Sequence, residues 1–470
     1  MDLQLTIAPG PRREQVERQL RDAVRAGRLR PGTRLPPTRT LAADLGVSRG
    51  VVVEAYEQLV AEGWLVARRG AGTVVAELGG AGPDGAPAAR DHDHDDGLPV
   101  GSARPTTPAA AYDLRTGRPD LSAFPRTAWH AALGRALRTL PDEALGYGDP
   151  RGHLPLRAAL AAYLGRARGV IAAPQDVVIA GGVHAGLHLV WPVLRERGAR
   201  RVAVEDPGWR GQRRSVEHAG LELVPVRVDE RGLRTDALAE LDVDAVCVSP
   251  AHQYPTGVVL APERRAALIA WAERSGGTIV EDDYDAEYRY DREAVGALQA
   301  LAPSRVVYAG SASKTLAPAL RLGWLAVPPH LTAGVAREAE LAARAIPTLD
   351  QAAYADLLQR GEVDRHLRRT RRRYRPRRDA LVRALGEHLP DRPVTGIAAG
   401  LHVVLELPPD ADEAATVDAI AASGVLVEGL HENCTAVAPR APALLLGYAA
   451  LPEPALARAA TLLAARIGSR

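Results

Sequence analysis

The chain has 470 residues, enough for two to four domains, and its 46% hydrophobic and 25% charged residues are the balance of a globular protein. No apolar run reaches the roughly 18 residues of a membrane span. The N-terminus has no signal-peptide core, so we expect a cytoplasmic protein. Two cysteines, Cys247 and Cys434, are too few for a disulfide framework or a cysteine-based zinc site. A net charge of +2 does not by itself indicate a polyanionic partner.

The basic residues are distributed unusually between lysine and arginine. The 59 lysines and arginines include a single lysine, Lys314. Solvent-facing positions tolerate arginine in place of lysine, but a position that needs a deprotonatable amine does not, because guanidinium stays protonated. Lys314 is therefore a candidate for covalent chemistry.

Residues 78–112 are predicted to form a flexible linker, since Gly, Pro, Ala and Asp dominate and no period produces an apolar face. An HDHDD run lies within it. Nothing nearby fixes ligand geometry, so we expect a solvated acidic segment and no metal site. The linker separates residues 1–77 from residues 113–470.

The N-terminal piece is predicted to be a winged helix-turn-helix, mainly α-helical with a β wing. Apolar residues from Val16 to Val24 recur at helical spacing, and two further short helices flank Gly46. The sequence WLVARRGAGTVV then indicates two short strands. The first 78 residues hold 12 arginines and 9 acidic residues, a weak excess that a helical interaction module would also fit.

The stretch LRPGTRLPPTRTLAADLGVSRGVVVEAYEQLVAEGWLVARRGAGTVV resembles the GntR-type winged helix almost end to end. The resemblance implies a double-stranded DNA operator as partner. It also implies DNA contacts from Arg39, Ser48, Arg49, Gly50, Arg68, Arg69 and Gly70. Arg49, at the start of the recognition helix, could read a guanine bidentately. Ser48 and the backbone of Gly50 are better suited to phosphate.

The C-terminal piece alternates strand-like and helical stretches. Short runs rich in Val and Ile predict buried strands of a mostly parallel sheet at residues 176–180, 201–205, 244–249, 277–283 and 305–310. Ligands of such sheets bind at the carboxyl ends of the strands. The loops at those ends supply a glycine turn, an aromatic ring, an amide and hydroxyls, a carboxylate and the only lysine.

Each of these groups matches a chemical requirement for binding pyridoxal 5′-phosphate. A lysine amine forms a Schiff base with it, and a carboxylate beside the pyridine nitrogen keeps that nitrogen protonated. An aromatic ring stacks on the cofactor. A glycine turn into a helix, hydroxyls and an arginine such as Arg321 hold the phosphate.

Residues 113–470 resemble a fold type I, class I aminotransferase domain in DLRTGRPDLSAFP, LGYGDPRGHLPLR, VEDPGW, SPAHQYPTG, IVEDDYDAEYRY and GSASKTLAPALRLGW. A GntR winged helix linked to this α/β domain is typical of the MocR subfamily of bacterial regulators, and the chain is identified as a member. The resemblance implies a large domain at about residues 140–360. The small domain would combine the N-terminal segment of this piece with residues from about 361 to 470.

The resemblance assigns roles residue by residue. Lys314 would be the Schiff-base lysine, Asp282 the partner of the pyridine nitrogen and Tyr284 a donor to the ring hydroxyl, and these three are the candidate catalytic residues. The other implied cofactor residues are Trp209, which stacks on the ring, and Gly182, Val183, His184, Ser311, Ser313 and Arg321, which surround the phosphate. Tyr147 matches a tyrosine that reaches the phosphate of the neighbouring subunit. A head-to-tail homodimer is therefore implied, with each winged helix over the partner's large domain.

The chain departs from the enzyme pattern at two positions. Tyr254 stands where the enzymes carry an asparagine, so Tyr254, Gln253 or His252 could bond the ring hydroxyl. Leu445 aligns with the arginine that grips the substrate carboxylate. These departures favour a regulator that senses pyridoxal phosphate, or an amine bound to it, as do the members that control pyridoxal phosphate synthesis. The alternatives are an active aminotransferase with an attached DNA-binding domain, and a dimerisation module without cofactor.

Residues 360–378 hold ten arginines. They could contact DNA beside the operator. We favour a long connecting helix with a solvated face.

Overall fold

The computed structural model describes residues 12–26, 28–68, 72–76, 111–290, 295–342, 346–435 and 440–468, with only the backbone of Arg68. Most of the predicted linker, its HDHDD run included, lies outside the described residues, as do the wing residues Arg69 and Gly70.

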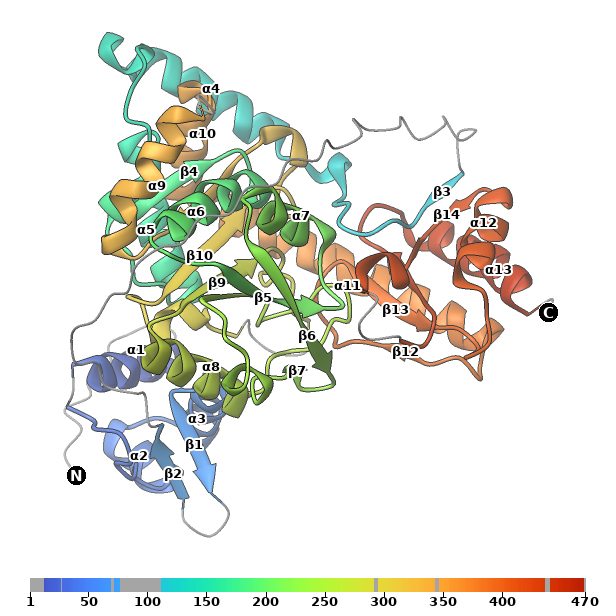
Figure 1. Ribbon diagram of the computed structural model, residues 1–470, viewed down its shortest axis with the longest axis horizontal. Helices are drawn as coiled ribbons and strands as arrows, with labels where there is room; N and C mark the ends of the chain where they lie inside the picture. Colours follow the sequence, from blue (N-terminus) through green and yellow to red (C-terminus); the bar gives the residue numbers. More distant parts are fainter. Residues whose placement is uncertain are drawn as a thin grey trace.

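The N-terminal unit consists of three helices and a hairpin (Figure 1). The helices are α1 (Arg12–Arg25), α2 (Thr38–Leu45) and α3 (Arg49–Glu62), and strands β1 (Leu65–Arg68) and β2 (Gly72–Val75) pair antiparallel. Gly46, with φ +63°, ends α2 in the left-handed region that favours glycine. The helix-turn-helix and wing predicted from the sequence are therefore present.

The large domain is built on an eight-stranded sheet in the order β4-β11-β10-β9-β8-β5-β6-β7. The strands are β4 (Val177–Ala180), β5 (Arg201–Asp206), β6 (Glu222–Asp229), β7 (Gly232–Leu233), β8 (Ala245–Val248), β9 (Thr278–Asp283), β10 (Val306–Ser311) and β11 (Gly323–Ala326). The five predicted strands are β4, β5, β8, β9 and β10. The short strands β7 and β11 run antiparallel to their neighbours, which makes the sheet mixed.

Helices cover both faces of the sheet. Helices α6 (Val183–Glu196), α7 (Arg210–His218) and α9 (Pro329–Leu341) share an apolar cluster with one face, which presents Val202, Cys247 and Val307. The opposite face packs at one end on α5 (Leu154–Arg168) and α10 (Thr348–Gln359), and α4 (Arg126–Thr139) joins the same cluster. Its other end packs on α8 (Pro262–Ser275).

The small domain contains a four-stranded sheet in the order β12-β13-β16-β15. These strands are β12 (Val394–Thr395), β13 (His402–Glu406), β15 (Glu428–Gly429) and β16 (Ala443–Gly447). Helices α12 (Glu413–Ala422) and α13 (Glu453–Ile467) belong to this part of the chain. Strand β3 (Tyr112–Asp113) pairs with β14 (Val425–Leu426), so the chain joins the small domain directly after the linker.

The arginine-rich segment lies in α11 (Glu362–His388), the helix that connects the two domains. Several of its arginines have partners within the domain: Arg373 and Arg377 both pair with buried Asp120 at 3.0 Å, and Arg371 donates to the carbonyl of Glu287. These contacts agree with the connecting-helix interpretation that the sequence favoured.

The winged helix packs on the large domain of its own chain. It contacts α8 and the segment that leads into and includes the short helix Leu298–Leu301. Its core residues, such as Leu59 and Trp64, belong to the same apolar cluster as Val246, Ile279 and Leu298 of the large domain. The resemblance implies that this unit lies over a partner's large domain. In the structure of the single chain, the winged helix packs on the large domain of the same chain.

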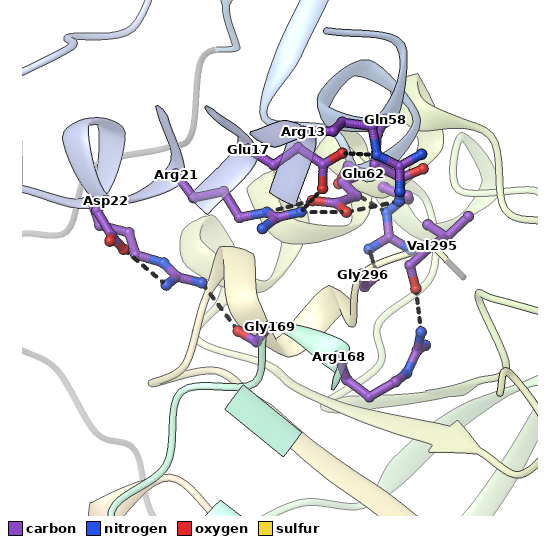
Figure 2. Close-up of polar contacts among 12 residues, drawn as sticks. Arg13, Glu17, Arg21, Asp22, Gln58, Glu62, Arg168, Gly169, Val295 and Gly296 are labelled. Carbon is purple, nitrogen blue, oxygen red and sulfur yellow. Dashed lines mark hydrogen bonds and ion pairs between the residues drawn. The ribbon is translucent and has the colours of Figure 1, made fainter. Parts of the chain in front are cut away.

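Polar contacts lie within the winged helix and between it and the large domain (Figure 2). Glu62, at the end of α3, is 3% exposed and accepts hydrogen bonds from Arg21 at 2.8 and 2.9 Å. Arg265 of α8 is fully buried and donates to the backbone carbonyls of Glu62 (3.2 Å) and Gly296 (2.8 Å). Arg25 donates to the carbonyl of Gly169 at 3.0 Å. The winged helix is therefore held by directional contacts as well as by apolar packing.

Candidate cofactor pocket and DNA-binding surface

A cavity of about 400 Å³ lies where the carboxyl ends of several sheet strands face the small domain. All the predicted cofactor residues except Tyr147 line it: Gly182, Val183, His184, Trp209, Tyr254, Asp282, Tyr284, Ser311, Ser313, Lys314 and Arg321. These residues come from separate loops, so the parallel sheet brings them together as expected.

Lys314 follows β10, and its Nζ donates a hydrogen bond to the carbonyl of Gly117 at 2.8 Å. Burial lowers the pKa of its ammonium group, which favours the nucleophilic neutral amine. Gly117 has φ +70°, and a Cβ there would lie 2.7 Å from Nζ. The positive φ favours glycine at position 117, beside the end of the lysine side chain.

Asp282 ends β9 and is 5% exposed. Its Oδ2 accepts a hydrogen bond from Nε2 of Gln212 at 2.7 Å, whereas Oδ1 is buried without a hydrogen-bond partner among the described residues. Burial raises the pKa of this carboxyl to about 7. An unsatisfied buried acceptor calls for a donor. A protonated pyridine nitrogen is such a donor, so the site fits the ring of pyridoxal phosphate.

The phosphate end of the cavity lies at the turn from β4 into α6. Gly182 has φ +105° and precedes the first turn of α6, where backbone N–H groups are not used within the helix. Strand β11 approaches so closely that a Cβ on Gly323 would lie 2.6 Å from Cα of Gly182. Arg321 holds a left-handed backbone, with φ +49°, as it lines the cavity. These features suit an anion.

Of the three candidates for the ring hydroxyl, only Tyr254 lines the cavity. The amide of Gln253 is directed to the carbonyls of Pro207 (2.8 Å) and Tyr254 (2.6 Å). His252 is buried, and its Nδ1 lies 3.0 Å from Asp285 and 3.0 Å from the hydroxyl of Tyr284. The geometry favours Tyr254, with His252 orienting Tyr284 from behind.

Several cavity residues were not predicted from the sequence, namely Thr116, Gly117, Asp285, His402 and Glu428. Gln212, which holds Asp282, was also missed. Thr116 and Gly117 lie in the matched stretch DLRTGRPDLSAFP, which gave no role to either residue. Glu428 comes from a two-residue strand of the small domain, and no local pattern marks it.

The predicted DNA-contact residues on α2 and at the start of α3 are exposed to solvent. Arg39, Ser48, Arg49 and Gly50 are all exposed, and Ser48 makes no capping hydrogen bond to α3. Arg68 ends β1. Val52 is buried in the unit's own core, so it does not take part in base readout.

Comparison with known proteins gives the family. Residues 12–75 match the family "Bacterial regulatory proteins, gntR family", and residues 113–460 match "Aminotransferase class I and II". The chain is 38% identical over 391 residues to the "Probable rhizopine catabolism regulatory protein MocR" of Rhizobium meliloti, which covers 81% of this chain and 78% of that protein. The chain belongs to the MocR subfamily of GntR regulators. This MocR-type chain is also 35% identical to the pyridoxine biosynthesis transcriptional regulator PdxR of Corynebacterium glutamicum, over 83% of the chain and 82% of PdxR.

The large and small domains of this MocR-type chain are similar to solved aminotransferases. An archaeal alanine:glyoxylate aminotransferase superposes with a TM-score of 0.71 and 26% identity, over 76% of this chain and 91% of that one. The fold type expected from the sequence is therefore confirmed. No helix among the described residues is long and apolar enough to cross a membrane.

Tyr147 does not lie in the cofactor cavity. Its side chain is fully exposed and lines a separate cavity of about 250 Å³ with Gly148, His153 and Gly181. Gly181 lines both cavities. The two cavities therefore adjoin at the turn after β4.

Proposed function

We propose that this MocR-type protein is a DNA-binding transcription regulator whose aminotransferase-like domain binds pyridoxal 5′-phosphate and communicates its presence to the winged helix. One observation supports the proposal above others. The winged helix packs on α8 and on the 295–301 segment, and Glu281 of β9, the strand whose Asp282 lines the cofactor cavity, holds that segment.

When bound, the cofactor would supply an aldehyde for Lys314 and an electron-withdrawing ring. Lys314 provides the amine, and burial lowers the pKa of its ammonium group. Asp282 offers Oδ1 to the ring nitrogen while Gln212 holds Oδ2. Trp209 would stack on the ring, and Tyr254 and Tyr284 would bind the ring hydroxyl. The turn at Gly182 to His184, with Ser311, Ser313 and Arg321, would hold the phosphate.

The residues on either side of Asp282 support the coupling. Alternate residues of a strand point to opposite faces. Glu281 accepts the backbone N–H groups of Leu298 and Gln299, both at 2.8 Å. Asp283 accepts from Nε of Arg168 at 2.7 Å, and Arg168 donates to the carbonyl of Val295 at 2.6 Å.

The segment that Glu281 and Arg168 hold also touches the DNA-binding unit. Arg265 joins the carbonyl of Gly296 to that of Glu62, the last residue of α3. A change at Asp282 can therefore reach α3 through two layers of hydrogen bonds. In a head-to-tail homodimer the same contacts would join the winged helix of one chain to the large domain of its partner.

The alternative is an active aminotransferase with an attached DNA-binding domain. An α-carboxylate in a closed site needs charge-assisted hydrogen bonds, which a bidentate arginine supplies. Leu445, at the aligned position, is fully buried and packs in an apolar cluster with Val404 and Leu430. This environment supports sensing over turnover, with the cofactor, or an amine bound to it, as effector.

The test joins cofactor binding to DNA binding. Purified protein is incubated with pyridoxal phosphate, reduced with borohydride and digested to map the adduct. We expect the adduct on Lys314 in the wild type and none at this position in Lys314→Ala or Lys314→Arg. Operator DNA, selected by the protein from random duplexes, is then titrated with and without cofactor. Cofactor should shift the affinity of the wild type and leave Lys314→Ala unchanged.

A wild type without any adduct would refute cofactor binding. An adduct on Lys314 without any effect on DNA affinity would refute sensing. Rapid release of a keto acid when amino acids are added would restore the enzyme alternative.

A further inference from the structure

The small-domain sheet places a glutamate beside the position where the enzymes carry their carboxylate-binding arginine. Strand β15 pairs antiparallel with β16, and Glu428 lies directly opposite Leu445 in the register. Directly opposed residues share one face of a sheet, with Cβ atoms about 4.5–5.5 Å apart. Leu445 packs beside Tyr254, and both Tyr254 and Glu428 line the cofactor cavity. The charge at this end of the cavity is thus the reverse of that expected for an amino-acid site.

Glu428 is held in place by a short polar chain. Its Oε2 accepts the backbone N–H of Thr116 at 3.1 Å and the hydroxyl of Thr116. Oγ1 of Thr116 lies 3.0 Å from the hydroxyl of Tyr254. Burial raises the pKa of Tyr254 to about 12, so this tyrosine stays neutral. The carboxylate of Glu428 is therefore fixed in the cavity wall.

The arginines near this end of the cavity form their ion pairs with other carboxylates, while the charge of Glu428 acts on Lys314 and Arg115 only at longer range. Of the two arginines that line the cavity, Arg321 lies at the phosphate end, and Arg210 pairs with Glu432 at 3.0 Å. Outside the cavity, Arg115 and Arg118 both pair with Asp113, at 2.7 and 2.9 Å. Among the described residues, no arginine, lysine or histidine nitrogen forms an ion pair with the Glu428 carboxylate within 4.0 Å.

We propose that the cavity takes an aliphatic amine with a second cationic group, which binds at Glu428, in place of an amino acid. The inference rests on the proposed function, because the ligand occupies the space between the cofactor position and the small domain.

Electrostatics predicts different affinities for two ligands of equal length whose end groups carry opposite charges. A carboxylate at this end would meet the like charge of Glu428 and, with Leu445 at the arginine position, would lose its water without a compensating donor. An ammonium group would replace its water by a charge-assisted hydrogen bond to a fixed carboxylate. The preference should therefore be carried by Glu428.

The experiment compares butane-1,4-diamine, 4-aminobutanoate and butylamine on cofactor-loaded protein. Dissociation constants come from isothermal titration calorimetry and, independently, from changes in the cofactor absorbance band. We expect the diamine to bind the wild type at least tenfold more tightly than either of the others. Glu428→Gln keeps the side-chain shape and should weaken diamine binding about tenfold, which corresponds to about 1.4 kcal/mol. Glu217→Gln, an exposed change of equal charge on α7 outside the cavity, should leave all three constants unchanged.

Retention of the cofactor band in Glu428→Gln shows that the variant is folded. The inference is wrong if 4-aminobutanoate binds the wild type as tightly as the diamine. It is also wrong if Glu428→Gln binds the diamine as the wild type does. Binding of 4-aminobutanoate that disappears in Arg210→Ala would identify Arg210 as a carboxylate grip and overturn it. If the wild type and both variants all lack the cofactor band, the proposed function itself is refuted, and this inference with it.

Discussion

Arg265 offers the sharpest test of the contact between the winged helix and the large domain. Its buried guanidinium joins the carbonyl of Glu62 to that of Gly296. A hydrogen bond to a charged group contributes about 1.5–3 kcal/mol. Replacement by methionine keeps much of the apolar packing and removes both bonds, but it also relieves the burial of a charge. Burial already lowers the pKa of Arg265. We therefore expect Arg265→Met to weaken docking by about 2 kcal/mol, or about 30-fold.

Docking is measured by hydrogen exchange at the end of α3, in the full chain loaded with cofactor. In Arg265→Met, the backbone amides of Gly63 and Trp64 should exchange their hydrogens faster than in the wild type. The cofactor should also change the operator affinity of this variant less than that of the wild type. Arg264→Met is the matched control, because Arg264 of the same helix bonds Asp229 and the carbonyl of Gly232 in the large domain. If exchange and cofactor response in Arg265→Met equal those of the wild type, the coupling argument fails.

Other changes test separate parts of the molecule. Burial raises the pKa of Glu17 to about 7, so its stabilising neutral form is lost as the pH rises from about 4.5 through 7. In thermal melts, the melting temperature of Glu17→Gln should therefore rise relative to that of the wild type between pH 5 and pH 8. A difference in melting temperature that stays constant over this range would contradict the prediction. Arg49→Ala should weaken operator binding by about 1–3 kcal/mol and relax sequence preference, whereas Arg69→Ala should weaken specific and non-specific binding alike. Arg168→Ala leaves Asp283 buried and unpaired and should cost about 3–5 kcal/mol in urea unfolding. A loss below 1 kcal/mol would show that the pair is replaceable.

Local signals predicted much of the fold and part of the site. Runs such as VVIA and TIVEDD are short, β-branched and bounded by turns, so β4 and β9 could be predicted, and the lone lysine marked Lys314 without any structure. Strand β11, with the sequence GWLA, is as short as β4 but carries no β-branched residue and begins with glycine, so it does not stand out. Gln212 and Glu428 reach the site only through tertiary packing, since a helix face and a strand register far along the chain decide their positions. The resemblance implied a winged helix over a partner's large domain, but the contact residues Glu62 and Arg265 were missed because they resemble ordinary charged residues of helix surfaces.

The acidic row in β9 explains how a bound ligand could act without a large rearrangement. Glu281, Asp282 and Asp283 are consecutive, all buried, and burial raises the pKa of Glu281 and of Asp282 to about 7. A positive ring nitrogen at Asp282 would offset one charge of this row and relieve its repulsion of the other two. Those two carboxylates hold Arg168 and the backbone of Leu298 and Gln299, on the side where the winged helix docks. Because interactions between charges are stronger in a buried environment than in water, neutralising one carboxylate changes how firmly the other two hold their donors. Under the proposed function, the same strand would bind the cofactor on one face and support the segment that contacts the DNA-binding unit on the other.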